Sequence, residues 1–229
     1  MKTISTARAI SASELKRMDP RRFDREYSKW VEWQWDDDWY VESTKDKFQN
    51  EYKLKGIDIE ELHYSISFSQ GDYASFSGRV YLSDWMRAVQ TCRDGPTYAE
   101  RYPALFLACD ADGSYMDVKG EDDRRGWRAD YQENWYNTPP SGIFATMPDE
   151  DWEALVLEQA SEADLETEII KYCRSIGKDI YRDLSDYYLE ATSEDAFIES
   201  CEANSVTFEI EVEPEDSEED EHEICCEDQ

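Results

Sequence analysis

Negative charge constrains this chain more than any other feature of its sequence. Of its 229 residues, 55 are Asp or Glu and only 24 are Lys or Arg, so the formal net charge is −31. Such a charge opposes compaction through self-repulsion, and solubility alone needs a magnitude of only about 2–8 in a small domain. A strongly positive binding partner is therefore the simplest reason for the charge.

The charge is concentrated in the last third of the chain. Residues 144–229 contain 29 acidic and 4 basic residues, a net charge of −25, whereas residues 1–143 have a net charge of −6. Because such a surface repels nucleic acid and anionic lipids, we expect no direct binding to nucleic acid or membranes. The sequence predicts a mixed, aromatic-rich α/β part over 1–143, an acidic helical part over 144–213 that completes the same domain, and a disordered acidic tail over 214–229.

The chain has enough apolar residues for a packed core. Hydrophobic residues make up 40% of the sequence and aromatic residues 14%, which excludes a wholly disordered chain. No apolar run approaches the roughly 18 residues that span a bilayer, and residues 1–8 lack the apolar core of a signal peptide. The six cysteines show no compact disulfide spacing, so we expect a reducing, cytoplasmic environment.

Local patterns place helices and strands along the chain. The first dozen residues are small and polar and predict an irregular start, and Asp19 followed by Pro20 marks a helix start. A second helix is expected from Ser43 or Thr44 to Gly56. A period of two then predicts a β-hairpin near 59–82. Further expected elements are a helix near 98–109 and an antiparallel pair at 115–119 and 127–131.

The acidic third has a strong periodic pattern. Apolar residues spaced by threes and fours predict a long acidic helix near 163–190. Strict alternation of apolar and polar residues predicts a strand near 206–213 with one face in water. The predicted fold class is therefore α+β, in which a small antiparallel sheet, formed by the hairpin near 59–82 and the strand near 206–213, packs with several helices.

Motifs for catalysis or metal binding are weak. The segment from Asp110 to Ser114 resembles the start of a calcium loop, but its glycine falls at position four rather than six, so an Asp/Gly turn is the better interpretation. His63 lies within a predicted strand without a nucleophile motif, which favours a structural role. No phosphate-binding glycine loop is present. We therefore expect no enzyme activity, cofactor or metal. An enzyme acting on a small molecule is kept as a third hypothesis, behind the two protein-binding hypotheses given below.

Two sets of residues are candidates for binding a partner. Carboxylates at helical spacing, with others on the outer face of the strand, are separated by about 5–7 Å, on the scale of DNA phosphates. A solvated acidic face is the alternative. Three tryptophans near residue 35 either pack over the sheet or form an exposed aromatic patch. The candidates are Asp179, Asp183, Asp186, Glu190, Glu209, Glu211 and Glu213, with Trp33, Trp35 and Trp39.

The string from Phe68 to Phe76 resembles one found in uncharacterised accessory proteins of tailed bacteriophages and prophages. Those proteins also have a later segment similar to Ile180-Tyr-Arg182, Ser193-Glu-Asp-Ala196, Glu202-Ala-Asn204 and Phe208. The resemblance implies a phage accessory protein made in a bacterial cell, and it implies no catalytic residues. The long acidic tail and Tyr73 depart from that pattern.

Charge and resemblance together favour one hypothesis. The protein is expected to be a phage-encoded DNA mimic that occupies the cationic cleft of a host nucleic-acid-binding protein, such as a restriction or CRISPR-type nuclease. A homodimer would extend the negative surface. The alternative is an acidic regulator of host transcription or of a toxin that binds through the aromatic patch.

Overall fold

The chain is organised into two compact units. The computed structural model describes residues 6–34, 38–66, 72–120, 126–131 and 147–212. One unit, here called the sheet unit, is Asp36–Leu189, and the other, the terminal unit, combines Met1–Trp35 with Glu190–Gln229. The boundary expected at residue 143 and the tail expected from residue 214 both lie outside the described residues.

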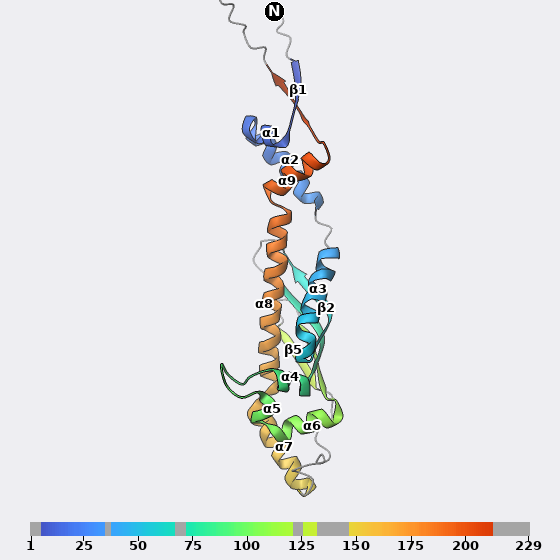
Figure 1. The fold of residues 1–229 in the computed structure, drawn as a ribbon, viewed down its shortest axis with the longest axis vertical. Coiled ribbons are helices and arrows are strands. Elements are labelled where there is room, and N and C mark those ends of the chain that lie inside the picture. The colour runs from blue at the N-terminus through green and yellow to red at the C-terminus, as the bar shows by residue number, and fades with distance from the viewer. Residues whose placement is uncertain (1–5, 35–37, 67–71, 121–125, 132–146, 213–229) are drawn as a thin grey trace, which may run out of the picture. The chain divides into compact units, whose positions relative to one another are not determined.

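An antiparallel sheet of four strands, in the order β2-β3-β4-β5, organises the sheet unit (Figure 1). The predicted hairpin is confirmed by β2 and β3, and the predicted pair at 115–119 and 127–131 is confirmed by β4 and β5. The strands are β2 (Ile57–Ser65), β3 (Tyr73–Tyr81), β4 (Tyr115–Gly120) and β5 (Trp127–Tyr131).

The two faces of this sheet differ in chemistry because side chains alternate along each strand. Phe76 and Val80 on β3 are fully buried, as is Met116, the β4 partner of Val80. On the opposite face Arg79 pairs with Asp117 at 3.5 Å between Nε and Oδ1. The sheet therefore has one face in the core and one polar face, as expected for an antiparallel sheet.

Helices cover the apolar face of the sheet. The helix expected from Ser43 begins earlier, at Asp38, so that Tyr40 is helical too. It leads into a 3₁₀ turn, Lys53–Lys55, that ends at Gly56 in the left-handed conformation, with φ of 74°. The helices of this unit are α3 (Asp38–Tyr52), α4 (Leu82–Ala88), α5 (Tyr98–Arg101), α6 (Pro103–Asp112), α7 (Asp149–Ala163) and α8 (Leu165–Ala191), of which the last two residues belong to the terminal unit.

The long acidic helix predicted near 163–190 is confirmed as α8, which runs beside α3 and the sheet (Figure 1). Its buried side chains recur every three or four residues and form one apolar stripe. The ring of Tyr187 stacks on Tyr40 of α3, with 3.5 Å between ring centroids. The stripe consists of Ile169, Cys173, Ile176, Ile180 and Leu184.

The terminal unit has its own small sheet and core. Strand β6 confirms the strand expected near 206–213, but it pairs antiparallel with β1 rather than with the hairpin, so Ala9 lies opposite Glu209. Its core includes Phe23 and Phe197, whose ring centroids are 5.4 Å apart. The elements are β1 (Thr6–Ile10), α1 (Ala12–Met18), α2 (Pro20–Gln34), α9 (Glu194–Ala203) and β6 (Phe208–Val212).

The irregular start expected for the first dozen residues is wrong for those that the structure describes. Ser11 and Glu14 form a capping box that starts α1, and Ile10 and Leu15 are buried. A window of small polar residues does not reveal this order, because it depends on pairing with a strand about 200 residues away in the sequence.

Candidate functional site

The four predicted carboxylates of α8 have different surroundings. Asp186 and Glu190 are exposed, as a partner-binding role requires. Asp179 is half-buried and pairs with Arg182 one turn away, at 3.3 Å between carboxylate and guanidinium. The helical stripe is thus only partly available as free negative charge.

Asp183 serves an internal role instead. Its carboxylate accepts hydrogen bonds from the hydroxyls of Thr44 at 3.3 Å and Tyr40 at 3.4 Å, and it forms an ion pair with Lys47. The hydrogen bond with Asp183 raises the pKa of the Lys47 ammonium, and burial followed by the charge of Asp183 raises the pKa of Tyr40. Asp183 therefore joins α8 to α3.

The strand carboxylates belong to the terminal unit. Glu209 and Glu211 are exposed on β6, while Phe208 and Ile210 pack against the core of that unit, so the expected alternation holds over these residues. Glu213 lies outside the described residues. The helix residues Asp179, Asp183 and Asp186 belong to the sheet unit, so the predicted set is divided between two units.

Of the three predicted tryptophans, Trp39 is the one whose side chain the structure describes. Trp39 is 76% exposed at the start of α3. Trp33 lies in the last turn of α2, which belongs to the terminal unit, and Trp35 lies outside the described residues. An exposed indole of this size is a typical binding anchor, so Trp39 is available for the role that the aromatic hypothesis gives it.

A surface with more free carboxylates than the predicted stripe of α8 lies on α7 and the first turn of α8. No Lys or Arg occurs between Arg128 and Lys171. On α7 the side chains of Trp152 and Val156 are buried, so they mark the inner side of the helix. Eight carboxylates on the remaining surface are exposed, and none forms a salt bridge with a described residue. They are Asp149, Glu150, Asp151, Glu153, Glu158, Glu162, Asp164 and Glu166.

Three of these carboxylates form a stripe. Asp151, Glu158 and Glu162 occur at positions i, i+7 and i+11 of α7, so they lie along one line of the helix. Glu158 and Glu162 are separated by a rise of about 6 Å, which is the scale of phosphate spacing along a DNA strand, and Asp151 and Glu158 by about 10.5 Å. The gap in basic residues marks this region in the sequence, although the stripe becomes visible only once the helix is placed.

The residues considered for metal binding or catalysis make contacts within the fold. Asp110 lies in the last turn of α6 and pairs with Arg87 at 3.4 Å, and Gly113 closes the helix with φ of 62°. A ring nitrogen of His63 lies 3.3 Å from the hydroxyl of Ser77. Within the described ranges, no group of three or more His, Cys, Asp or Glu side chains could hold a metal ion. Burial raises the pKa of Cys173 to about 12, so this thiol stays protonated near neutral pH.

The fold and its surface define a small α+β protein whose most prominent chemical feature is exposed carboxylate. The chain belongs to a family described as a domain of unknown function, DUF8835, which matches residues 39–194. The matched segment runs from α3 into α9 and contains nearly all of the sheet unit, including the acidic α7.

Further comparisons add no named relative. Neither a curated protein nor a solved structure matches the chain. Among the helices in the described ranges, none combines the length and the apolar character that crossing a membrane requires.

Proposed function

We propose that this protein binds a basic protein through the carboxylates of α7 and the first turn of α8, and that it acts as a DNA mimic. The observation that carries the proposal is the set of eight exposed carboxylates without salt bridges to described residues. Free carboxylates can pair with Lys and Arg of a partner, whereas carboxylates already paired within the chain cannot do so without losing that pair.

The proposed target is the nucleic-acid cleft of a host protein. Such a cleft collects Lys and Arg at the spacing of phosphates. A helix that presents Glu158 and Glu162 at a similar interval, with Asp151 farther along the same line, complements it. The exposed Asp186 of the sheet unit would extend the attraction, while Asp183 is excluded by its internal contacts. Glu190, Glu209 and Glu211 are exposed carboxylates of the terminal unit. Phage origin, a nuclease as target and a cytoplasmic location form part of this proposal; Phe68 in the string that suggests phage origin lies outside the described residues.

The test compares two variants with the same change in net charge. The first is the triple variant Asp151→Asn, Glu158→Gln and Glu162→Gln on α7. The control is Asp46→Asn, Glu61→Gln and Asp94→Asn, which neutralises three exposed carboxylates elsewhere in the sheet unit. Asp94 has φ of 62°, a conformation that Asn also tolerates.

Each form of the full chain is used to capture proteins from bacterial lysate at low salt, and the bound fraction is challenged with duplex DNA at constant ionic strength. We expect a nucleic-acid-binding protein that is displaced by DNA, retained by the control and captured at least about tenfold less by the α7 variant. A partner that DNA does not displace, or an equal loss of capture in the α7 variant and the control, would contradict mimicry by α7.

The exposure of Trp39 supports a second candidate, an acidic regulator of transcription or of a toxin that binds through this indole. Under this alternative Trp39→Ala abolishes capture and the α7 variant does not. The same lysate experiment therefore distinguishes the two functions.

A further inference from the structure

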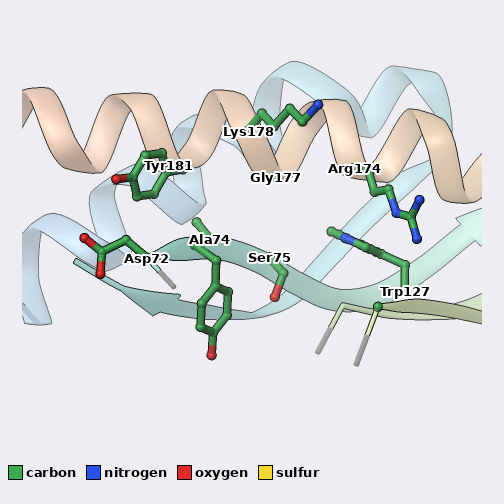
Figure 2. Close-up of a pocket in the computed structure, with 10 residues that line it drawn as sticks. Asp72, Ala74, Ser75, Trp127, Arg174, Gly177, Lys178 and Tyr181 are labelled. Atoms are coloured by element: carbon green, nitrogen blue, oxygen red, sulfur yellow. The ribbon is translucent and has the colours of Figure 1, made fainter. Parts of the chain in front are cut away.

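A cavity of about 420 Å³ lies in the sheet unit between α8 and the strands β3 and β5 (Figure 2). Its volume falls within the range of roughly 300–1,000 Å³ that is typical of small-molecule sites. None of the acidic side chains of α7 lines it, so it is separate from the proposed protein-binding surface. The residues around it include Asp72, Ser75, Trp127, Arg174, Lys178 and Tyr181.

The backbone forms one wall of this cavity. At Gly177 the helix approaches β3 so closely that an added Cβ would lie 2.8 Å from the carbonyl oxygen of Ala74 and 3.2 Å from Cζ2 of Trp127. The indole of Trp127 is also held edge-on against Phe76, with 5.0 Å between ring centroids. The position of the indole is thus set by packing before any ligand binds.

Two cations lie at the cavity. Arg174 and Lys178 line it one turn apart on α8, and neither forms a salt bridge within the described ranges. Their neighbours on the same helix are paired: Lys171 with Glu168 at 2.5 Å, and Arg182 with Asp179 at 3.3 Å.

The segment of α8 that ends with these two cations contains no acidic residue. Residues 169–178 contain no Asp or Glu, although the chain as a whole has 55 acidic residues. Like charges at i and i+4 repel each other on a helix, so the pair is unfavourable unless an anion lies between or beside it. Within the described ranges this pair of cations at a cavity has no salt bridge, which favours binding of an anion there.

The two ends of the cavity differ. Figure 2 shows Arg174 and Trp127 at one end, and Asp72 and Tyr181 at the other. A guanidinium beside an indole suits a ligand that joins an anionic group to a flat ring. The carboxylate at the far end disfavours a second anionic group there and favours hydroxyl or amino groups.

We propose that this cavity binds a small aromatic monophosphate of the mononucleotide class. Arg174 and Lys178 hold the phosphate, the indole of Trp127 contacts the ring, and the end near Asp72 receives its polar substituents. Longer nucleic acids are disfavoured because the net charge of −31 repels polyanions, whereas a small ligand in contact with two cations is governed by local charge.

The test is calorimetric titration of the full-length protein with adenosine 5′-monophosphate at physiological ionic strength. We expect saturable binding, with adenosine and inorganic phosphate each at least about tenfold weaker because each lacks one half of the ligand. Arg174→Gln and Lys178→Gln should each weaken binding by about tenfold or more. The matched control, Arg182→Gln, removes the same charge from the same helix outside the cavity and should bind normally.

The indole N–H signals in an NMR spectrum locate the ligand independently. The signal of Trp127, identified by its loss in Trp127→Phe, should shift on titration, whereas that of Trp39, which is exposed and does not line the cavity, should not. Absence of saturable binding up to about 5 mM, or equal weakening by Arg182→Gln, would overturn the site. Equal affinity for inorganic phosphate would overturn the aromatic part of the proposal.

Discussion

At Gly177 the absence of a side chain decides how closely α8 approaches the sheet. Replacing Gly by Ala within a helix normally stabilises it by about 1 kcal/mol. Here the new methyl group would lie 2.8 Å from a strand carbonyl oxygen, so α8 or β3 must shift. We expect Gly177→Ala to lower the free energy of unfolding by about 1–3 kcal/mol in urea titrations. Ser175→Ala, at an exposed position on the same helix, should change it by less than about 0.5 kcal/mol.

The contacts of Asp183 predict a dependence of stability on alkaline pH. The pKa of Lys47 is raised in the folded chain above its ordinary value of 10.5. The stabilisation from this pair is therefore complete below pH 10.5 and is lost as the pH rises through the folded value. Tyr98 and Tyr172, whose pKa values burial raises to about 12, act in the same direction, because both are neutral in the folded chain until that pH.

Comparison of variants isolates the contribution of the pair. At pH 7, Asp183→Asn should cost about 1 kcal/mol, because Lys47 is largely exposed and its attraction is screened. As the pH rises above 10.5, the variant should lose less stability than the native chain, measured as urea midpoints. Asp186→Asn, an exposed position on the same helix, is the control. A steeper loss in Asp183→Asn than in the native chain would refute the role given to this carboxylate.

At the scale of elements, the start of α1 depends on one side chain. The hydroxyl of Ser11 accepts a hydrogen bond from the backbone N–H of Glu14 at 3.2 Å, and the carboxylate of Glu14 accepts one from the N–H of Ser11 at 3.0 Å. This second bond is the main cause of the lowered pKa of Glu14. We expect Ser11→Ala to destabilise the protein by about 0.5–2 kcal/mol in thermal or urea unfolding.

Ser13→Ala is the matched control for the cap, since it makes the same substitution at an exposed position inside α1. It should be neutral or slightly stabilising because Ala has the higher helix propensity. Similar losses in the two variants would mean that the capping box contributes nothing. Helical content from circular dichroism should fall only in Ser11→Ala.

For the whole molecule, salt should stabilise the folded state. Each exposed ion pair contributes only about 0–1 kcal/mol, and screening weakens it. The net charge of −31 acts over the entire compact state, so relief of self-repulsion should exceed the loss from the pairs. We expect the urea midpoint to rise steadily from low salt to about 1 M NaCl. A midpoint that falls with salt would show that attractive pairs dominate.

Much of the secondary structure follows from local sequence, because burial of one face imposes a period. The spacing of Ile169, Cys173 and Ile176 predicts α8, and Phe208 alternating with Glu209 predicts β6. The partner of β6 could not be predicted in this way. Its pairing with β1 depends on contacts between the two ends of the chain, which no local pattern contains.

The charge of the protein, its α+β character and the acidity of its last third were determined by the sequence alone, since each depends on composition or on short-range periodicity. Only the tertiary structure decided which charges are free. It places Asp183 against Lys47, leaves Glu158 and Glu162 exposed, and brings Arg174 beside Trp127 at one cavity. The physical reason is that the availability of a charge depends on its neighbours in space, and those come from segments far apart in the chain.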